Sequence, residues 1–584
     1  MILKMKKYTF LVFHKEYEDF LTQLREAGVV HVSEKAAGVA NDERVQELMA
    51  RKKEVKHLLS QGAPDQLLQE KAAVEQSIAD SQRHKKEVEM WGDFSTERLH
   101  QLEEAGYKLR FFMCADKYFD PSFGIEVASR GSAIYFAAIE SMMPYEEMVD
   151  VCNEIKLDKS IGDIERDIEA ETGLLAAANA RIEAWQLANI EPLKQELADI
   201  EHQIDWRKVQ LNTNVLGEGA LMLLEGYCPE EKTEALNQML DEAHIYYQAV
   251  DPVVTDNTPI QLRNNRFAKL FEVLTGMYGW PTYGEFDPTP ILAPFYLLFF
   301  AMCMGDAGYG IMLMILGTLI AKGKLKISMF DGLGPIIAVL GAGTTVVGFI
   351  LGTFFGIPLV EASWYPEVLK SFIVSGDVAG YDAQMVLAVG IGVFHICFAM
   401  VVKALCYTKR FGFRESVSVW GWLLLIVGSL STIILSMALT LPIEVTKWTL
   451  IGIAGVSALG IYIFNTPGRN PLINIGAGLW ETYNMATGIL GDVLSYVRLY
   501  ALGLAGGMLG KAFNDLATMP AGGSMDGATW QWLPFLVIVL LGHTLNLLMS
   551  GLGAFVHPLR LTFVEYFKNS GYEGKGTLYR PFAK

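Results

Sequence analysis

Two arginines stand inside the last long apolar segments of this 584-residue chain. Arg498 lies in GDVLSYVRLYALG and Arg560 lies in HPLRL. A charged side chain at membrane depth costs at least about 2.5–3.5 kcal/mol, so such a residue is a functional candidate by default. An arginine stays protonated and cannot relay protons itself, but it attracts a carboxylate and favours release of the H⁺ or Na⁺ bound there. Snorkelling to an interface is the competing interpretation, and it is stronger for Arg560, which lies nearer the end of its segment.

Small and polar residues share one helical face with Arg498. They are Asn484, Gly488, Gly491 and Ser495. Helical spacing places them on one side, and a face of this kind lets another helix approach closely. The membrane half offers no obvious carboxylate on this face. We therefore expect the ion-carrying carboxylate on another chain, which moves past a fixed Arg498.

A polar stripe runs along the last apolar segment at a spacing near 3.6 residues. Its members are His543, Asn546, Ser550, Gly553, His557 and Arg560, and Glu565 continues it. A lone histidine would be typical of a satisfied helix contact, whereas a full stripe favours a water-accessible ion path. Asp306 and Glu481 are weaker candidates, and Asp306 is most simply a turn or packing residue.

The sequence contains no motif for nucleotide binding or for redox chemistry. The glycine-rich runs 305–310 and 506–511 both fail the GxxxxGK[ST] template. The six cysteines form no CxxC pair and indicate reduced, buried thiols; they are Cys114, Cys152, Cys228, Cys303, Cys397 and Cys406. We expect no catalytic residue, no cofactor and no metal site on this chain.

The charge of the chain divides near residue 290. The whole carries a net charge of −17 with 51% hydrophobic residues. Basic and acidic residues number 31 and 51 before the division, and 17 and 14 after it. The pattern predicts an acidic soluble half joined to an apolar membrane half, which excludes a single soluble globule and disfavours a nucleic-acid partner. The N-terminus lacks the pattern of a signal peptide, so we expect the soluble half in the cytoplasm.

The soluble half predicts an α+β cytoplasmic arm. Two separated βαβ units, 1–40 and 216–260, can pair into a proximal ferredoxin-like α/β lobe. Residues 41–100 and 156–215 have near-heptad apolar positions that predict an antiparallel coiled coil. Residues 101–155 predict a second, distal ferredoxin-like α/β lobe with a helix near 144–156, and residues 261–290 predict a linker to the membrane. An autonomous dimerising coiled coil is the alternative to this returning rod.

Residues 291–584 predict an α-helical membrane domain of eight transmembrane helices. The apolar segments are 289–304, 307–321, 333–356, 384–406, 417–440, 448–465, 478–513 and 530–567. The first two could be a hairpin turning at Gly305-Asp306 or one oversized span. Eight spans with both termini cytoplasmic put 12 basic residues inside against 3 outside, as the positive-inside rule requires. The last two segments exceed the bilayer thickness, so these helices must tilt or extend beyond it.

At these residues the sequence resembles a known family, the membrane-embedded stator subunit (subunit a, or I in prokaryotes) of rotary V-type and archaeal-type ATPases. The resemblance covers nearly the whole chain. The matching pieces are RNNRF (263–267), FEVLTGMYGWP (271–281), DPTP (287–290), GDAGYG (305–310), LSYVRLYALGLA (494–505), HPLRLTFVEYF (557–567) and GYCP (226–229).

The resemblance implies that Arg498 faces a proteolipid rotor ring (c/K subunits) and that Arg560 is a second arginine there. His557 and Glu565 would line the cytoplasmic half-channel. The lobes would hold peripheral-stalk subunits of E/G type and meet a central-stalk subunit of d/C type. The whole protein would be located in a prokaryotic plasma membrane. Eukaryotic members often carry a histidine eight residues after the stator arginine, and Gly506 stands at that position here.

The arginine-bearing membrane half is also compatible with two other functions. A secondary transporter could use Arg498 to bind an anionic substrate, but transporter folds show repeated broken helices and no such repeat is visible. A purely structural anchor leaves the Arg498 face unexplained. Specificity for H⁺ or Na⁺ depends on a carboxylate that lies on another chain.

Overall fold

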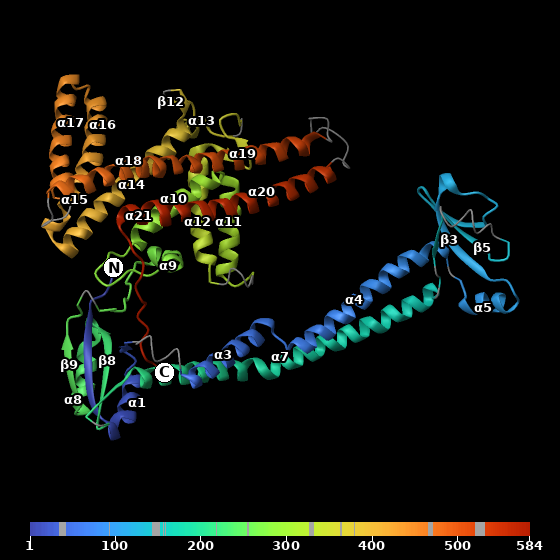
Figure 1. The fold of residues 1–584 in the computed structure, drawn as a ribbon. Helices are drawn as coiled ribbons and strands as arrows, with labels where there is room; N and C mark the ends of the chain where they lie inside the picture. The colour runs from blue at the N-terminus through green and yellow to red at the C-terminus, as the bar shows by residue number, and fades with distance from the viewer. Residues whose placement is uncertain are drawn as a thin grey trace. The chain divides into compact units, whose positions relative to one another are not determined.

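The computed structural model describes residues 1–584 apart from 34–41, 93, 143–151, 156, 158, 218, 254–255, 326–331, 363–364, 379, 465–470, 520–531 and 584 (Figure 1). The chain forms two compact units. One comprises Met1–Ser33 and Asn214–Ala583, and the other comprises essentially Glu34–Thr213.

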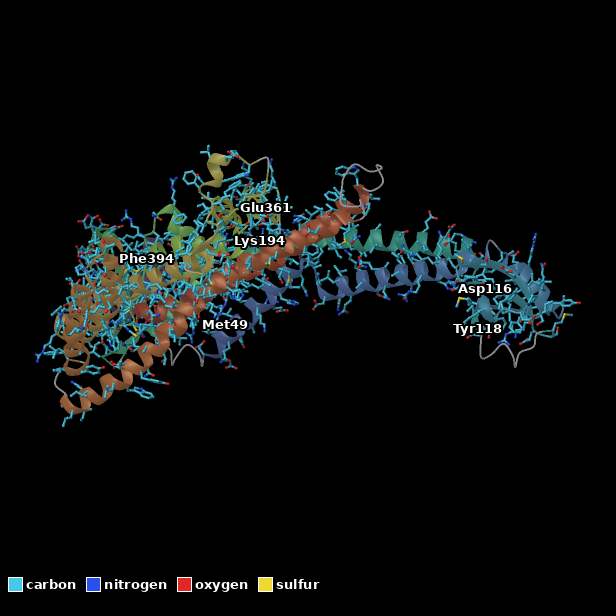
Figure 2. The ribbon with its side chains drawn as sticks, turned by 90° about the horizontal axis from the view of Figure 1, so that it is seen from above. Met49, Asp116, Tyr118, Lys194, Glu361 and Phe394 are labelled. Carbon is cyan, nitrogen blue, oxygen red and sulfur yellow. The ribbon has the colours of Figure 1, made fainter. Side chains whose placement is uncertain are left out.

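A long helical hairpin dominates the second unit. Helices α3 (Glu43–Gln61) and α4 (Asp65–Val88) pack along α7 (Ile161–Asn212). Gly62 ends α3 in the left-handed conformation, at the break that its Gly-Ala-Pro motif predicts. The 52 residues of α7 span roughly 78 Å at ~1.5 Å per residue. Figure 2 shows Met49 on α3 and Lys194 on α7 among the side chains of this hairpin.

Apolar and ionic contacts show that the hairpin is antiparallel. Val55 packs with Ile200 and Ile204. Asp42 caps α3 and pairs with Arg207 at 2.8 Å, and the hydrogen bond from Arg207 holds the pKa of Asp42 below its usual range. Early residues of α3 thus meet late residues of α7, and the same reversal recurs where Lys85 pairs with Glu165 at 2.7 Å.

A four-stranded antiparallel sheet lies between α4 and α7 in the chain. Its order is β4 (Ile125–Arg130), β5 (Ala133–Ile139), β3 (Leu109–Ala115), β6 (Cys152–Ile155), with α5 (Thr96–Glu104) before it. Asp116 and Tyr118 follow β3 (Figure 2). The predicted helix near 144–156 is wrong at 152–155, because Cys152 pairs with Cys114 of β3 and faces the sheet core; residues 143–151 lie outside the described part.

A five-stranded antiparallel sheet opens the first unit. Its order is β2 (His31–Val32), β8 (Leu221–Pro229), β1 (Met5–Phe13), β9 (Tyr246–Val250), and β7 (Asn214–Leu216) also pairs with β8. Helices α1 (Tyr17–Ala27) and α8 (Thr233–Glu242) connect the strands and bury Phe20, Leu24 and Leu240. The two separated βαβ units therefore share one sheet.

Within the described residues, six helices are long and apolar enough to cross a membrane. They are α12 (Gly334–Leu351), α14 (Ala383–Phe411), Phe413–Leu439, Ile443–Ile463, Leu472–Thr518 and Trp532–Ser570. Two shorter apolar helices, α10 (Thr289–Met304) and α11 (Ala307–Ala321), are separated by a left-handed Gly305. Large apolar side chains project outward from these helices, as Phe394 does with 60% of its surface exposed (Figure 2).

The two longest spans are not single regular helices. Leu472–Thr518 divides into α18 (Pro471–Ser495) and α19 (Val497–Thr518) at Tyr496. The last span consists of α20 (Trp532–Arg560), a π-helical turn (Leu561–Tyr566) and α21 (Phe567–Ser570). Helix α20 runs alongside α19 (Figure 1). π-Helical turns of this kind occur frequently at functional sites.

The tail after α21 returns across the linker to the first sheet. Gly576 N donates to Trp280 O at 2.7 Å, and Ile260 exchanges backbone hydrogen bonds with Thr577 and Tyr579. The Tyr579 hydroxyl donates to Val29 O at 2.6 Å. This tail ties the last membrane helix to the five-stranded sheet through buried backbone pairing.

Candidate ion-translocation site

The break at Tyr496 sets the position of Arg498. The Tyr496 ring is fully buried against Gly392 of α14, where an added Cβ would lie 2.3 Å from the ring. Its hydroxyl lies 2.8 Å from His395 Nδ1. The tyrosine is therefore locked to α14 by packing and a hydrogen bond, and Arg498 follows two residues later at the start of α19.

Arg498 is half-buried, and its Nη1 atom has no hydrogen-bond partner among the described residues. An unmade bond at a buried donor is unfavourable, because the donor has lost its water. The charges of Arg498 and Arg560 both act on His557. The structure thus brings three predicted site residues into one region, with Arg560 exposed at the end of α20.

The small-residue face next to Arg498 is largely uncovered. Asn484 and Gly491 are exposed, and Gly488 and Ser495 are partly exposed. A side chain at Gly491 would meet no atom within 4 Å. Among the described residues, the face is therefore open at Gly491.

The first three residues of the predicted stripe belong to a buried set that we call the neutral network: Tyr309, Asn514, His543, Asn546 and Ser550. Asn546 Nδ2 donates to the Tyr309 hydroxyl at 2.8 Å, and that hydroxyl lies 2.7 Å from His543 Nδ1. His543 Nε2 lies 2.9 Å from Asn514 Oδ1, and Ser550 donates to Asn546 Oδ1 at 3.0 Å.

The direction of the hydrogen bonds in the neutral network can be assigned. Asn514 Nδ2 donates to Phe355 O at 2.7 Å, which turns its Oδ1 toward His543. Nε2 of His543 must then carry the proton, and Nδ1 accepts from the Tyr309 hydroxyl. The histidine is a neutral member of a continuous donor–acceptor chain.

Asp306 stands beside the neutral network as a fully buried helix cap. Its carboxylate accepts from the backbone N–H groups of Gly308, Tyr309, Phe355 and Gly356 at 2.7–3.2 Å. Four N–H donors explain why this charge can be buried without a cation. Asp306 therefore fixes the turn between α10 and α11 and aligns Tyr309.

Gly506 lies at the contact between α19 and α20. An added Cβ there would lie 2.9 Å from Ser550 Oγ, and the Gly506 carbonyl accepts from Asn546. Close packing thus leaves no room for a larger side chain at this position. Asn546 and His543 supply polar groups on the facing helix instead.

A second polar set, which we call the charged cluster, comprises Asp492, Ser495, Glu565, Lys568 and Asn569. Glu565 is 2% exposed, its carboxyl interacts with the Ser495 hydroxyl, and its Oε2 atom has no hydrogen-bond partner among the described residues. Asp492 is 8% exposed and accepts from Asn569 Nδ2 at 2.8 Å and from Lys568 Nζ at 3.3 Å. The π-helical turn and α21 carry its last three members.

Asp492 and the partners Tyr309, Asn514, Lys568 and Asn569 were not predicted as site residues. An acidic residue six positions before Arg498 in an apolar segment was a usable signal for Asp492. Nothing in the sequence indicated that Tyr309 and Asn514 would meet His543.

A cavity of about 210 Å³ lies along α19, bounded by α10, α12 and α14. Gly305, Asp382, Leu499, Tyr500 and Lys511 are among its lining residues. The Tyr500 hydroxyl bonds to Asp382. Because Leu499 adjoins Arg498, the cavity brings a partly polar space close to the arginine.

Fold and site together define a multi-pass helical membrane protein with polar and charged groups buried among its last helices. The chain belongs to the V-type ATPase 116kDa subunit family, whose model matches residues 153–364 and 481–584. The family resemblance predicted from the sequence is thereby confirmed.

Relatives extend over the whole chain. The "V-type ATP synthase subunit I" of Borreliella burgdorferi is 27% identical across the full length of both proteins. "V-type ATP synthase subunit I 1" of Treponema pallidum is 28% identical, again over both full lengths. The "A-type ATP synthase subunit I" of Methanocaldococcus jannaschii is 31% identical over 62% of this chain and 54% of that protein.

Proposed function

We propose that this chain is the stator subunit of a rotary V/A-type ATPase or ATP synthase. It forms two ion half-channels against a rotating proteolipid ring and couples H⁺ or Na⁺ transport to ATP hydrolysis or synthesis. The ATP site belongs to other subunits. The family match and the relatives named as ATP synthase subunits support this assignment.

Arg498 is the observation that carries the proposal. It has a buried donor atom without a partner among the described residues, and it lies beside a face that offers no side chain at Gly491. Both features are explained if a ring helix lies on that face and presents a carboxylate. The guanidinium then lowers the affinity of that carboxylate for its ion and separates the two half-channels.

The neutral network and the charged cluster supply the two half-channels. In the eight-span topology with both termini cytoplasmic, the charged cluster lies on the cytoplasmic side and the neutral network on the opposite side. Helices α10 and α11 have 16 and 15 residues and are shorter than a hydrocarbon core of ~30 Å, so in this topology the turn at Gly305 would lie below the membrane surface opposite the cytoplasm. The cavity beside Gly305 would admit water to that depth.

The cytoplasmic arm anchors the peripheral stalks. The order β2-β8-β1-β9 with two connecting helices supports a ferredoxin-like proximal lobe, and the α3–α4–α7 hairpin supports a strut between two binding lobes. Such lobes fit E/G-type stalk subunits and a central-stalk d/C-type subunit. A prokaryotic plasma membrane is the expected location.

Reconstitution of the assembled ATPase tests the function. Arg498→Ala should abolish ATP-driven ion uptake into proteoliposomes, while Arg498→Lys keeps a charge but loses the planar guanidinium and should retain at most a small fraction. Uptake at the wild-type rate in Arg498→Ala would refute the proposal. Na⁺ dependence of ATP hydrolysis by the wild-type complex would identify the ion.

A further inference from the structure

Asp492 is a buried acidic residue with no assigned role in ion transport. It lies on α18 one and a half turns before Arg498, and it is bonded to the end of the last span by Asn569 Nδ2 at 2.8 Å and Lys568 Nζ at 3.3 Å. Asn569 is 5% exposed, and its Nδ2 also donates to the Glu565 carbonyl. One carboxylate thus connects α18 with both α21 and the π-helical turn.

Gly488 makes this connection possible. It precedes Asp492 by one helical turn, and an added Cβ would lie 3.3 Å from Lys568 Nζ. The lysine therefore reaches Asp492 across the surface of a residue that has no side chain. This gives Gly488 a role within the chain, whereas Gly491 has no neighbour within 4 Å.

The two carboxylates of the charged cluster have different surroundings. Asp492 has a cation and an amide donor within 3.3 Å. Glu565 has the Ser495 hydroxyl and an Oε2 atom without a partner among the described residues. Asp492 and Glu565 act on each other, both act on the buried Tyr496 hydroxyl, and Arg560 acts on Glu565.

We infer that Asp492 is a positioning residue whose fixed ion pair with Lys568, supported by Asn569, holds α18 against the end of the last span, so that Ser495 faces Glu565 and Arg498 faces the ring. Asp492 itself carries no transported ion. This inference rests on the proposed function, because it assigns Asp492 a part in the same ion path.

Paired substitutions in the reconstituted complex separate positioning from ion carriage. Lys568→Met leaves Asp492 without its cation, and Asp492→Asn leaves Lys568 without its anion, whereas the double variant removes both charges and keeps an amide next to Asn569. Lys568→Met leaves a charge buried at Asp492, which costs far more than removing both charges, whereas the lysine left by Asp492→Asn is 55% exposed and loses only its tie to α18. We expect each single variant to lose about tenfold in ion uptake per assembled complex, and the double variant to recover to within about threefold of wild type.

Three outcomes would overturn the inference. If Asp492 carried the ion, the double variant would be as inactive as Asp492→Asn, and Lys568→Met would remain active. If the pair served folding alone, all three variants would lower the amount of assembled complex without changing uptake per complex. If the contact had no role, all three would match wild type. Arg498→Ala in the same preparation tests the stator function separately, since its activity does not depend on this pair.

Discussion

The neutral network and the charged cluster differ in how their buried polar groups are stabilised. In the neutral network, His543, Asn546 and Tyr309 satisfy one another and carry no formal charge. In the charged cluster, Asp492 pairs with a lysine whose side chain is 55% exposed, whereas the buried carboxyl of Glu565 interacts with the Ser495 hydroxyl. A saturated neutral network is stable at membrane depth, whereas buried charges need compensation.

The difference indicates where an ion can be held. The hydrogen bonds of the neutral network have a fixed direction, and none of its members carries a negative charge that could bind a cation. We therefore expect the network to orient water and pack the helices, and not to hold the ion. The Oε2 atom of Glu565 has no hydrogen-bond partner among the described residues, and the cation that acts on its carboxyl, Arg560, is exposed. We therefore expect substitutions in the charged cluster to affect transport and those in the neutral network to affect stability.

Among substitutions in the two polar sets, the largest effect on transport should come from Glu565→Gln. The substitution keeps the size of the side chain and removes its ability to exchange an ion. ATP-driven uptake should fall by about 100-fold, the range over which a positioned acid–base group contributes, while assembly stays intact. Glu565→Asp is the matched control and should retain measurable uptake. Wild-type uptake in Glu565→Gln would remove this residue from the ion path.

His543→Ala should lower stability more than transport. It leaves the Tyr309 hydroxyl and Asn514 Oδ1 without their partner, and each buried unsatisfied group costs about 1–3 kcal/mol. The melting temperature of the purified complex should fall, while uptake per folded complex changes only a few-fold. A complete loss of uptake with unchanged melting temperature would show that His543 takes part in ion transfer itself and does not only orient water and pack the helices of its half-channel.

Gly506→Ala should destabilise the contact between α19 and α20 by about 1–3 kcal/mol, because the new Cβ meets Ser550 Oγ. Adding Ser550→Gly should restore part of the stability by removing that contact. Thermal unfolding of the two variants measures the difference. An unaffected single variant would show that the two helices can separate at no cost.

Gly491→Ala should have the smallest effect on the isolated chain, within about 0.5 kcal/mol, since no atom lies near the added methyl group. The comparison with Gly506→Ala distinguishes the uncovered face of α18 from the packed face of α19. A large destabilisation of the isolated chain would mean that the face is already occupied.

Hydropathy and turn chemistry predicted much of this architecture. Gly305 and Asp306 separate α10 from α11 where the sequence placed a hairpin, and the Asn484–Arg498 face emerged from helical spacing alone. Contacts between segments that are distant in the sequence could not be predicted from hydropathy or turn residues. Tyr309, Asn514 and His543 come from three different helices, and a single sequence does not say which faces meet.

Local patterns also failed where tertiary pairing decided the structure. Residues 152–155 joined β3 as an edge strand, because Cys152 could be buried in the sheet core. The break at Tyr496 depended on a pocket over Gly392 and a bond to His395, both on another helix. The contacts of Asp492 could not be predicted from local patterns, because its partners Lys568 and Asn569 lie more than 70 residues later.

Cross-linking from Gly491 tests most directly whether the face next to Arg498 meets the rotor. A Gly491→Cys variant of the assembled complex, with cysteines placed along the outer helix of the proteolipid, should form a disulfide with the ring under mild oxidation. Phe394→Cys on α14, equally accessible but on another helix, is the control and should not form it. Cross-linking from Phe394→Cys and none from Gly491→Cys would contradict the account.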